Sequence, residues 1–257
     1  MINVIRTALA ATGSLLLVSA CSSAEPDEPA ISVTPETPLT VFAAASLTEA
    51  FTQIGTDFHL KSGWTVRFNF GSSATLASQI NSGAPADVFA AASTATMKTV
   101  TDAGRAQTPV DFVSNTLGIA VPKGNPGKVT GLADFADAAK RIAICAPQVP
   151  CGAAAAKVFE AARITPRPDT LEQDVKATLA KVSADEVDAA LVYQTDVIAA
   201  PDDVEGIEFA EASQAVNTYP IAALTESKAA PSAKAFVDYV LSPEGQAVLQ
   251  RAGFAKP

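Results

Sequence analysis

Short apolar runs alternate with amphipathic stretches along most of the chain. Residues 39–42 and 64–70 alternate between apolar and polar side chains, as half-buried strands do. The apolar residues that follow the first run recur at the spacing of one helix face: Leu47, Ala50, Phe51, Ile54 and Phe58. The pattern therefore predicts a strand, a turn and then a helix.

The same alternation continues toward the end of the chain. Further strands are expected at 86–92, 117–124, 141–147, 188–193 and 219–224. Helices are expected after Gly71, at 94–104, 131–139 and 150–164, after Asp174, and as a pair over 231–254. Regular alternation of strands and helices predicts an α/β fold, in which ligands bind at the carboxyl ends of the strands.

Small residues and hydrogen-bonding groups mark four of the expected helix starts. These starts lie at Ser46, at Ser72 and Ser73, at Cys151 and Gly152, and at Val175. Free N–H groups and the positive end of the helix dipole make such places anion sites even without a basic side chain. Each also has a purely structural interpretation, since most capping serines only cap a helix.

Ser46 and Glu49 form an S-x-x-E motif at the first of these helix starts. This motif predicts a capping box, in which the serine oxygen accepts an amide N–H and the glutamate reaches back to the cap. We therefore expect the Ser46 side chain to bond to its own helix.

The first twenty residues form a segment of their own. Arg6 supplies positive charge, residues 15–20 are apolar and then small, and Cys21 follows at once. This order predicts an export signal over 1–20. Residues 18–21, Val-Ser-Ala-Cys, resemble a bacterial lipobox, which implies cleavage before Cys21 and a diacyl lipid on its thiol. A transmembrane anchor is the alternative, but the apolar stretch is well below the roughly 20 residues that a span needs.

A tether is expected between this signal and the folded part. Residues 21–38 contain four prolines and scattered acids but hardly any large apolar residue. Such a composition favours an extended chain without a packed core. The folded part should begin near Leu39.

Composition and charge limit the classes of partner. The 257 residues are 48% hydrophobic, enough to bury a substantial core in one large domain or two lobes. Eighteen Lys plus Arg against 27 Asp plus Glu give a net charge of −9. This balance argues against nucleic acid or an anionic membrane surface as the main partner. An anionic ligand would have to be attracted by local groups.

Cys145 and Cys151 lie six residues apart in a chain with an expected export signal. This compartment and spacing favour a disulfide over a metal pair, because the single histidine, His59, lies far away in an expected helix. A catalytic thiol would lack an orienting partner. The chain also has no G-x-S-x-G elbow, P-loop or acid pair, so we assign no catalytic residue.

Seven segments occur together in the order of a known family. They are VFAAASLTEAF, FGSSATLASQI, GAPADVFAAAS, VPCGAAAAKVFE, EQDVKATLAKV, DAALVYQTDV and SPEGQAVLQRAGF. Spread over residues 39–254, they resemble the molybdate-binding proteins of ABC uptake systems, the ModA family. The resemblance implies a two-lobed periplasmic binding protein, type II-like, with the ligand in the cleft between lobes joined by hinge strands.

The resemblance also implies the division of the chain. Lobe I would comprise residues 39–116 plus 221–257, and lobe II residues 117–220. The hinge strands would pass near 116–118 and 219–220.

The ligand set follows from the same resemblance. The family holds its oxyanion through two serines, backbone amides at two helix starts and a tyrosine hydroxyl. The matching residues here are Ser46, Ser73, Cys151, Val175 and Tyr193, with Ser72 as the alternative to Ser73. Only the backbone N–H is needed at Cys151, so a disulfide on its side chain is compatible. Molybdenum would be bound only as molybdate, through these five residues.

The expected function is capture of molybdate, with tungstate as a second ligand, outside the cytoplasmic membrane. The protein would be anchored to the outer face of that membrane only through the lipid on Cys21, and would deliver the oxyanion to an ABC permease and its ATPase. We expect a monomer with no enzymatic activity, no cofactor and no nucleic-acid partner. A binder of another oxyanion such as sulfate is the first alternative, and an exported α/β hydrolase or transferase the second.

Overall fold

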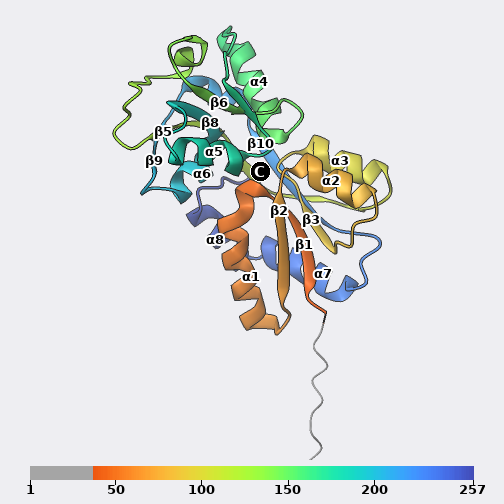
Figure 1. The fold of residues 1–257 in the computed structure, drawn as a ribbon. Coiled ribbons are helices and arrows are strands. Elements are labelled where there is room, and N and C mark those ends of the chain that lie inside the picture. Colours follow the sequence, from red (N-terminus) through yellow and green to blue (C-terminus); the bar gives the residue numbers. More distant parts are fainter. Residues whose placement is uncertain (1–36) are drawn as a thin grey trace, which may run out of the picture. The chain divides into compact units, whose positions relative to one another are not determined.

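The computed structural model describes residues 37–257, and the structural statements below refer to these residues. The described residues form one compact unit that contains two five-stranded sheets, each covered by helices (Figure 1). This arrangement confirms the predicted α/β class. The expected export signal, the lipobox and nearly all of the tether lie outside the described residues. Within the described part, no helix is long and apolar enough to cross a membrane.

The first sheet has the strand order β2-β1-β3-β10-β4. Its strands are β1 Leu39–Ala44, β2 Val66–Gly71, β3 Val88–Ala90, β4 Val110–Asn115 and β10 Asn217–Ala223. β1 pairs in parallel with β2 and β3, whereas β10 pairs antiparallel with β3 and β4. A late segment of the chain thus lies inside a sheet built mainly from early segments.

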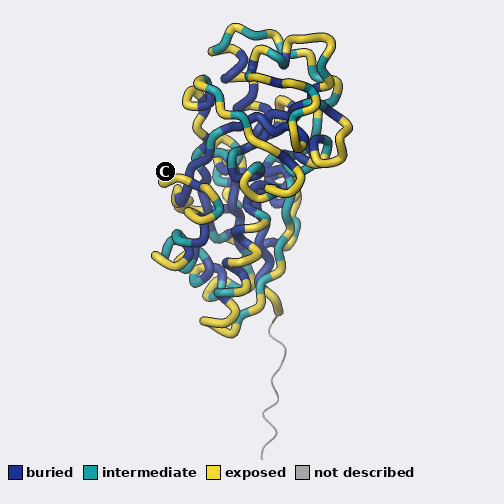
Figure 2. Tube along the Cα trace, turned by 90° about the vertical axis from the view of Figure 1, so that its left-hand side faces the viewer, coloured by how far each residue is buried: buried dark blue, intermediate teal, exposed yellow. Residues whose placement is uncertain are grey.

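Helices cover both faces of this sheet, which explains why β1 is buried along its whole length. Figure 2 shows that buried residues gather in the interior and exposed residues on the outside. Val41 and Ala43 share one core cluster with helices α1 Thr48–Ser62, α7 Ala230–Leu241 and α8 Pro243–Arg251. Phe42, on the opposite face, packs with residues of α2 Ser73–Asn81 and α3 Thr94–Asp102. Successive strand residues point to opposite faces, so both sets must be apolar when both faces are covered.

The second sheet has the order β7-β6-β8-β5-β9. Its strands are β5 Leu117–Pro122, β6 Ile142–Cys145, β7 Thr170–Glu172, β8 Ala189–Tyr193 and β9 Val204–Ile207. The helices of this part are α4 Pro150–Ala162, α5 Val175–Ser183 and α6 Gln194–Ala199. One continuous core cluster joins residues of α4 and α5 to the sheet. We refer to the first sheet with its helices as lobe I and to the second with its helices as lobe II.

The chain passes from lobe I to lobe II at Thr116, between β4 and β5. It returns just before Asn217, the first residue of β10. Residues 217–220 were expected in lobe II, but their strand pairs with β4, starting from Asn217 opposite Asn115. The sequence placed the return strand only from Tyr219 because Asn217 and Thr218 are polar.

Local expectations fail where segments are short. A helix was expected over 131–139, but only the 3-10 helix η2, Leu132–Ala136, forms there. Only two residues of this 3-10 helix are buried, Leu132 and Phe135, and they anchor a single short turn. The strands β4, β7 and β9 and the helix α6 were not expected. The remaining 3-10 helices are η1 Ala45–Leu47 and η3 Ala210–Gln214.

Gly152 is required where α4 meets the segment after β6. A Cβ atom built on Gly152 would lie 1.9 Å from the backbone oxygen of Ala146 and 2.8 Å from that of Cys145. These neighbours are main-chain atoms, so they cannot turn away as a side chain could. The start of α4 therefore lies directly against the end of β6.

We expect Gly152→Ala to lower the free energy of unfolding by about 2–3 kcal/mol, because the added methyl group must push backbone apart. Gly131→Ala is the matched control, since a Cβ at Gly131 meets nothing within 4 Å. The control should change stability by less than about 0.5 kcal/mol. Urea unfolding followed by circular dichroism measures both, and equal stabilities for the two variants would contradict the close contact.

Candidate functional site

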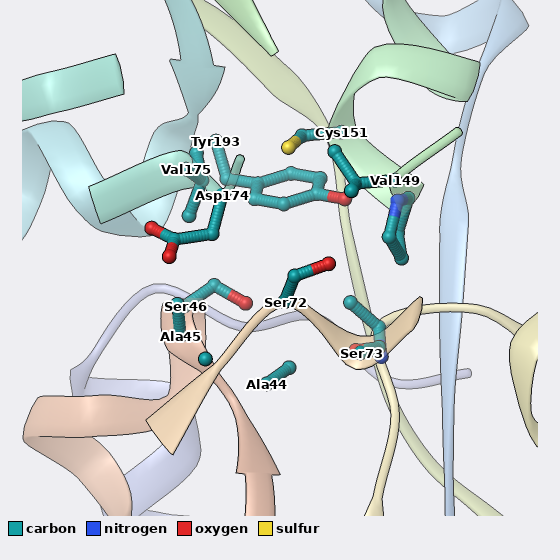
Figure 3. A pocket seen from close by; sticks show the side chains of 13 residues that line it. Ala44, Ala45, Ser46, Ser72, Ser73, Val149, Cys151, Asp174, Val175 and Tyr193 are labelled. Carbon is teal, nitrogen blue, oxygen red and sulfur yellow. Dashed lines mark hydrogen bonds between the residues drawn. The ribbon is translucent and has the colours of Figure 1, made fainter. Parts of the chain in front are cut away.

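A small pocket lies where the two lobes meet. It is lined by Ala44, Ala45, Ser46, Gly71, Ser72, Ser73 and Ala92 of lobe I, and by Val149, Pro150, Cys151, Asp174, Val175 and Tyr193 of lobe II. The structure thus brings together all five residues predicted from the sequence as ligand-binding: Ser46, Ser73, Cys151, Val175 and Tyr193 (Figure 3). The pocket volume is about 20 Å³. This is far below the roughly 300–1,000 Å³ of pockets that hold organic solutes.

Three α-helices begin at this pocket. α2 starts at Ser73, α4 at Pro150 and α5 at Val175. The N–H groups in the first turn of an α-helix have no acceptor within the helix. Neither α2 nor α4 has a side chain that caps it. The backbone N–H groups of Ser73, Cys151 and Val175 are therefore hydrogen-bond donors at the lining of the pocket.

The hydroxyl groups of Ser73 and Tyr193 already accept hydrogen bonds from the protein. Ser73 Oγ accepts from the backbone N–H of Ala92 at 2.9 Å. The Tyr193 hydroxyl accepts from the side-chain amide of Asn217 at 2.8 Å. A hydroxyl has one proton to donate, and these two bonds do not use it. Both groups are therefore placed to donate to a third partner.

Ser46 belongs to a similar arrangement. Its Oγ lies 2.9 Å from the hydroxyl oxygen of Tyr219, which is fully buried. When Tyr219 donates this bond, the Ser46 proton is free for a ligand. Burial raises the pKa of Tyr193 and that of Tyr219 well above the usual value, so both stay protonated donors.

The predicted capping box at Ser46 and Glu49 is wrong. Ser46 lies within the 3-10 helix η1, and α1 begins two residues later, at Thr48, with no side-chain cap. Because Ser46 itself has helical backbone, its oxygen is directed to Tyr219 and not to the α1 amides. Glu49 instead forms an ion pair with Lys176, with 2.9 Å between the charged atoms.

Asp174 is the one acidic residue among those lining the pocket. Its carboxylate accepts a hydrogen bond from the Ala177 amide at 2.9 Å, and it caps α5. Among the described residues no Lys or Arg lines the pocket, although Lys176 follows Val175 directly. Any attraction for an anion must therefore come from N–H and O–H dipoles and from helix starts.

Lys176 links three elements through its charge. Its Nζ lies 3.1 Å from Asp196 Oδ1 and 2.9 Å from Glu49 Oε1, so it joins α5 and α6 of lobe II to α1 of lobe I. Asp196 is fully buried, and its other oxygen accepts from the backbone N–H of Tyr193 at 3.1 Å. Burial raises the pKa of Asp196 to about 6, against the lowering effect of Lys176.

Four residues that support the site were not predicted from the sequence. Asn217 and Tyr219 come from β10 and orient Tyr193 and Ser46, while Lys176 and Asp196 hold α5 and the backbone of Tyr193. The sequence offered only a weak indication that Asp196 supports the site, since it is an acid three residues after the end of an expected strand. The other three depend on contacts between segments far apart in the chain.

Cys145 and Cys151 lie beside the pocket, at the end of β6 and in the first turn of α4. The structure pairs them, with their Cα atoms 5.8 Å apart. The pair closes the loop that carries Val149 and Pro150. Cys151 can therefore present its amide while its side chain is paired with Cys145.

Asp196 predicts a pH dependence of stability. Its folded-state pKa lies above the value of about 3.9 in an unfolded chain. The folded protein therefore binds the proton more tightly, and the contribution of Asp196 to the free energy of unfolding falls as the pH rises from about 4 to about 6. Urea unfolding of the wild type and Asp196→Asn at pH 4.5 and pH 7.5 measures this. The stability of the wild type relative to the variant should be lower at pH 7.5 by roughly 1–3 kcal/mol. A difference that does not change with pH would contradict the assignment.

Comparison with known proteins places the chain in a family. A family model described as bacterial extracellular solute-binding protein matches residues 39–255. The molybdate-binding protein ModA of Mycobacterium tuberculosis (strain ATCC 25618 / H37Rv) is 41% identical over 221 residues, which cover 85% of both chains. ModA of Escherichia coli (strain K12) is 33% identical over 235 residues, 84% of this chain and 88% of that one. The solved structure of the Azotobacter vinelandii periplasmic molybdate-binding protein has the same fold, with a TM-score of 0.72 and 20% identity over 85% of this chain and 99% of that one. The chain therefore belongs to the bacterial extracellular solute-binding protein family, together with these ModA relatives.

Proposed function

We propose that this protein binds molybdate, and tungstate as a second ligand, in the pocket between its lobes and delivers the oxyanion to an ABC importer. Proteins of this family bind solutes for transport and are not enzymes. The observation that carries the proposal is the donor set of the pocket. Hydroxyls whose oxygens already accept hydrogen bonds, such as those of Ser73 and Tyr193, lie beside first-turn amides of three helices.

A fully deprotonated tetrahedral dianion fits this donor set because each of its oxygens is an acceptor. Phosphate near neutral pH carries at least one proton, and that O–H would face groups that donate. An unpaired polar group of this kind costs about 1–3 kcal/mol when buried. Sulfate has no such proton but is smaller than molybdate. A pocket whose donors are spaced for the larger molybdate would hold sulfate with longer hydrogen bonds, so we propose that sulfate binds more weakly.

The proposed roles of the five residues follow from their positions. Ser46, Ser73 and Tyr193 donate through their hydroxyls, and Cys151 and Val175 through their backbone amides. We propose that the two lobes move against each other about the two points where the chain passes between them, at Thr116 and just before Asn217. Lobe I then comprises residues 39–116 and 221–257 together with the start of β10. Binding of another oxyanion such as sulfate is the alternative function. The titration described next distinguishes it from molybdate binding.

Calorimetric titration of the purified protein with molybdate, tungstate, sulfate and phosphate at one salt concentration tests the proposal. Molybdate and tungstate should bind far more tightly than sulfate, and sulfate no more weakly than phosphate. Ser46→Ala should weaken molybdate binding by about 1–3 kcal/mol, or 5- to 150-fold, because hydrogen bonds to a charged partner are strong.

Ser213→Ala serves as the control for that variant, since Ser213 is exposed on η3 and bonds only to a neighbouring backbone oxygen in the described structure. Its affinity should equal that of the wild type. Sulfate or phosphate binding as tightly as molybdate would overturn the proposed selectivity of this donor-rich pocket.

Two covalent features belong to the same proposal. We propose that export removes residues 1–20 and that a lipid on Cys21 holds the monomeric protein at the outer face of the cytoplasmic membrane, where it meets its permease and ATPase. We further propose that Cys145 and Cys151 form a disulfide in the exported protein. A closed loop of this length stabilises a fold by about 2–3 kcal/mol in the chain-entropy estimate.

Mass spectrometry of protein recovered from the cell envelope checks both features. After alkylation without reduction, Cys145 and Cys151 should carry no label, and the first residue should be Cys21 with a lipid mass added. Cys21→Ala should abolish the lipid mass and leave the protein outside the detergent phase. Labelled Cys145 and Cys151 would rule out the disulfide, and an intact, unmodified N-terminus would rule out the anchor.

A further inference from the structure

The Ser72 hydroxyl is a buried polar group with no partner in the described structure. Ser72 is only 6% exposed, and its Oγ forms no hydrogen bond with any described residue. Ser72 lines the pocket between Ser46 and Ser73, and Figure 3 shows its side chain reaching into that space. A buried hydroxyl without a partner destabilises a protein, so its presence at a candidate site requires an explanation.

Local structure directs this hydroxyl into the pocket. β2 ends at Gly71, and Ser72 is the residue that precedes the first turn of α2. A serine at that position ordinarily accepts a hydrogen bond from an amide of the first turn. Ser72 makes no such bond, although its backbone oxygen accepts from the Leu76 amide at 2.9 Å as the start of the helix requires. The backbone of a helix cap is present, but the side chain does not act as the cap.

Ser72 and Ser73 therefore differ although they are neighbours. Ser73 Oγ accepts a hydrogen bond from the Ala92 amide, and so part of its capacity is satisfied within the protein. The donor of Ser72 and both of its lone pairs are unused among the described residues. A ligand that carries only acceptors would satisfy the Ser72 donor at once.

We propose that Ser72 Oγ–H is a further direct donor to the bound oxyanion, in addition to the five residues assigned above. The inference rests on the proposed function and deepens it. A ligand oxygen would give the otherwise unpaired hydroxyl a hydrogen bond to a charged acceptor, which is among the stronger kinds. Such a bond would offset the cost of burying the Ser72 hydroxyl without a protein partner.

The roles of Ser72 and Ser73 can be distinguished by the stability of their alanine variants. Ser72→Ala removes a group that has no partner in the protein, so the ligand-free protein should be as stable as the wild type or more stable. Ser73→Ala removes the acceptor of a buried amide, so the ligand-free protein should be less stable. Both variants should bind more weakly, but only one should also fold less stably.

The experiment uses sodium molybdate and the wild type, Ser72→Ala and Ser73→Ala. Calorimetry gives the dissociation constants, and urea unfolding without ligand gives the stabilities. For Ser72→Ala we expect molybdate to bind roughly 10- to 100-fold more weakly, with unchanged or increased stability of the ligand-free protein. The exposed-site variant Ser213→Ala should change neither quantity.

Each other outcome is decisive. A molybdate affinity of Ser72→Ala within twofold of the wild type would show that the Ser72 hydroxyl does not contact the ligand. Its hydrogen-bond partner would then be a water molecule, or it would have none. A stability loss like that of Ser73→Ala would show that Ser72 has a partner within the protein, which also overturns the inference. Wild-type protein that binds none of the oxyanions would refute the proposed function and, with it, this role. Normal wild-type binding with an unaffected Ser72→Ala variant would refute this role alone.

Discussion

Backbone amides can hold an anion only if the main chain itself comes within hydrogen-bonding distance of one point, and this constraint dictates the residues around the pocket. Ala44, Ala45 and Gly71 keep the lobe I side thin. On the lobe II side, Gly152 lets α4 begin directly against the end of β6, where a Cβ would collide with the Ala146 oxygen. The three helix starts can converge because none of these positions carries a bulky side chain. The pocket is consequently small and lined by donors.

The basic side chain nearest the pocket in sequence is held outside it. Lys176, the basic residue next to Val175, is engaged by Asp196 and Glu49 and does not line the pocket. Burial lowers its pKa, but its two acidic partners outweigh this effect, so it stays protonated. Its charge serves to keep Asp196 buried and to hold α5 near α1. A protein of net charge −9 can therefore present a donor-rich pocket without a positively charged side chain in it.

Local periodicity in the sequence predicted the α/β class and the helix starts that meet at the pocket, whereas the choice of ligand residues, Tyr193 included, came from the resemblance to the ModA family. Prediction from the sequence failed where geometry between distant segments decides. Ser46 was expected to cap its own helix, but the 3-10 turn before α1 directs its hydroxyl to Tyr219, 173 residues away in the chain. The sequence likewise cannot show that the Ser72 hydroxyl lacks a hydrogen-bond partner, since this depends on which amides lie nearby in the fold. The expected helix over 131–139 was misjudged because two apolar residues can anchor a single 3-10 turn equally well.

The position of β10 has a consequence for the order of folding. In the first sheet β4 lies at the edge and β10 is its neighbour, yet β4 ends at Asn115 and β10 begins only at Asn217. The second sheet, in contrast, is built from one continuous stretch between these strands. Pairings between distant segments form more slowly than local ones, and domains tend to fold as units. The chain is synthesised from its N-terminus, so the strands of the first sheet are the first to appear. That sheet is nevertheless completed last, because β10 follows the whole of the second sheet in the chain.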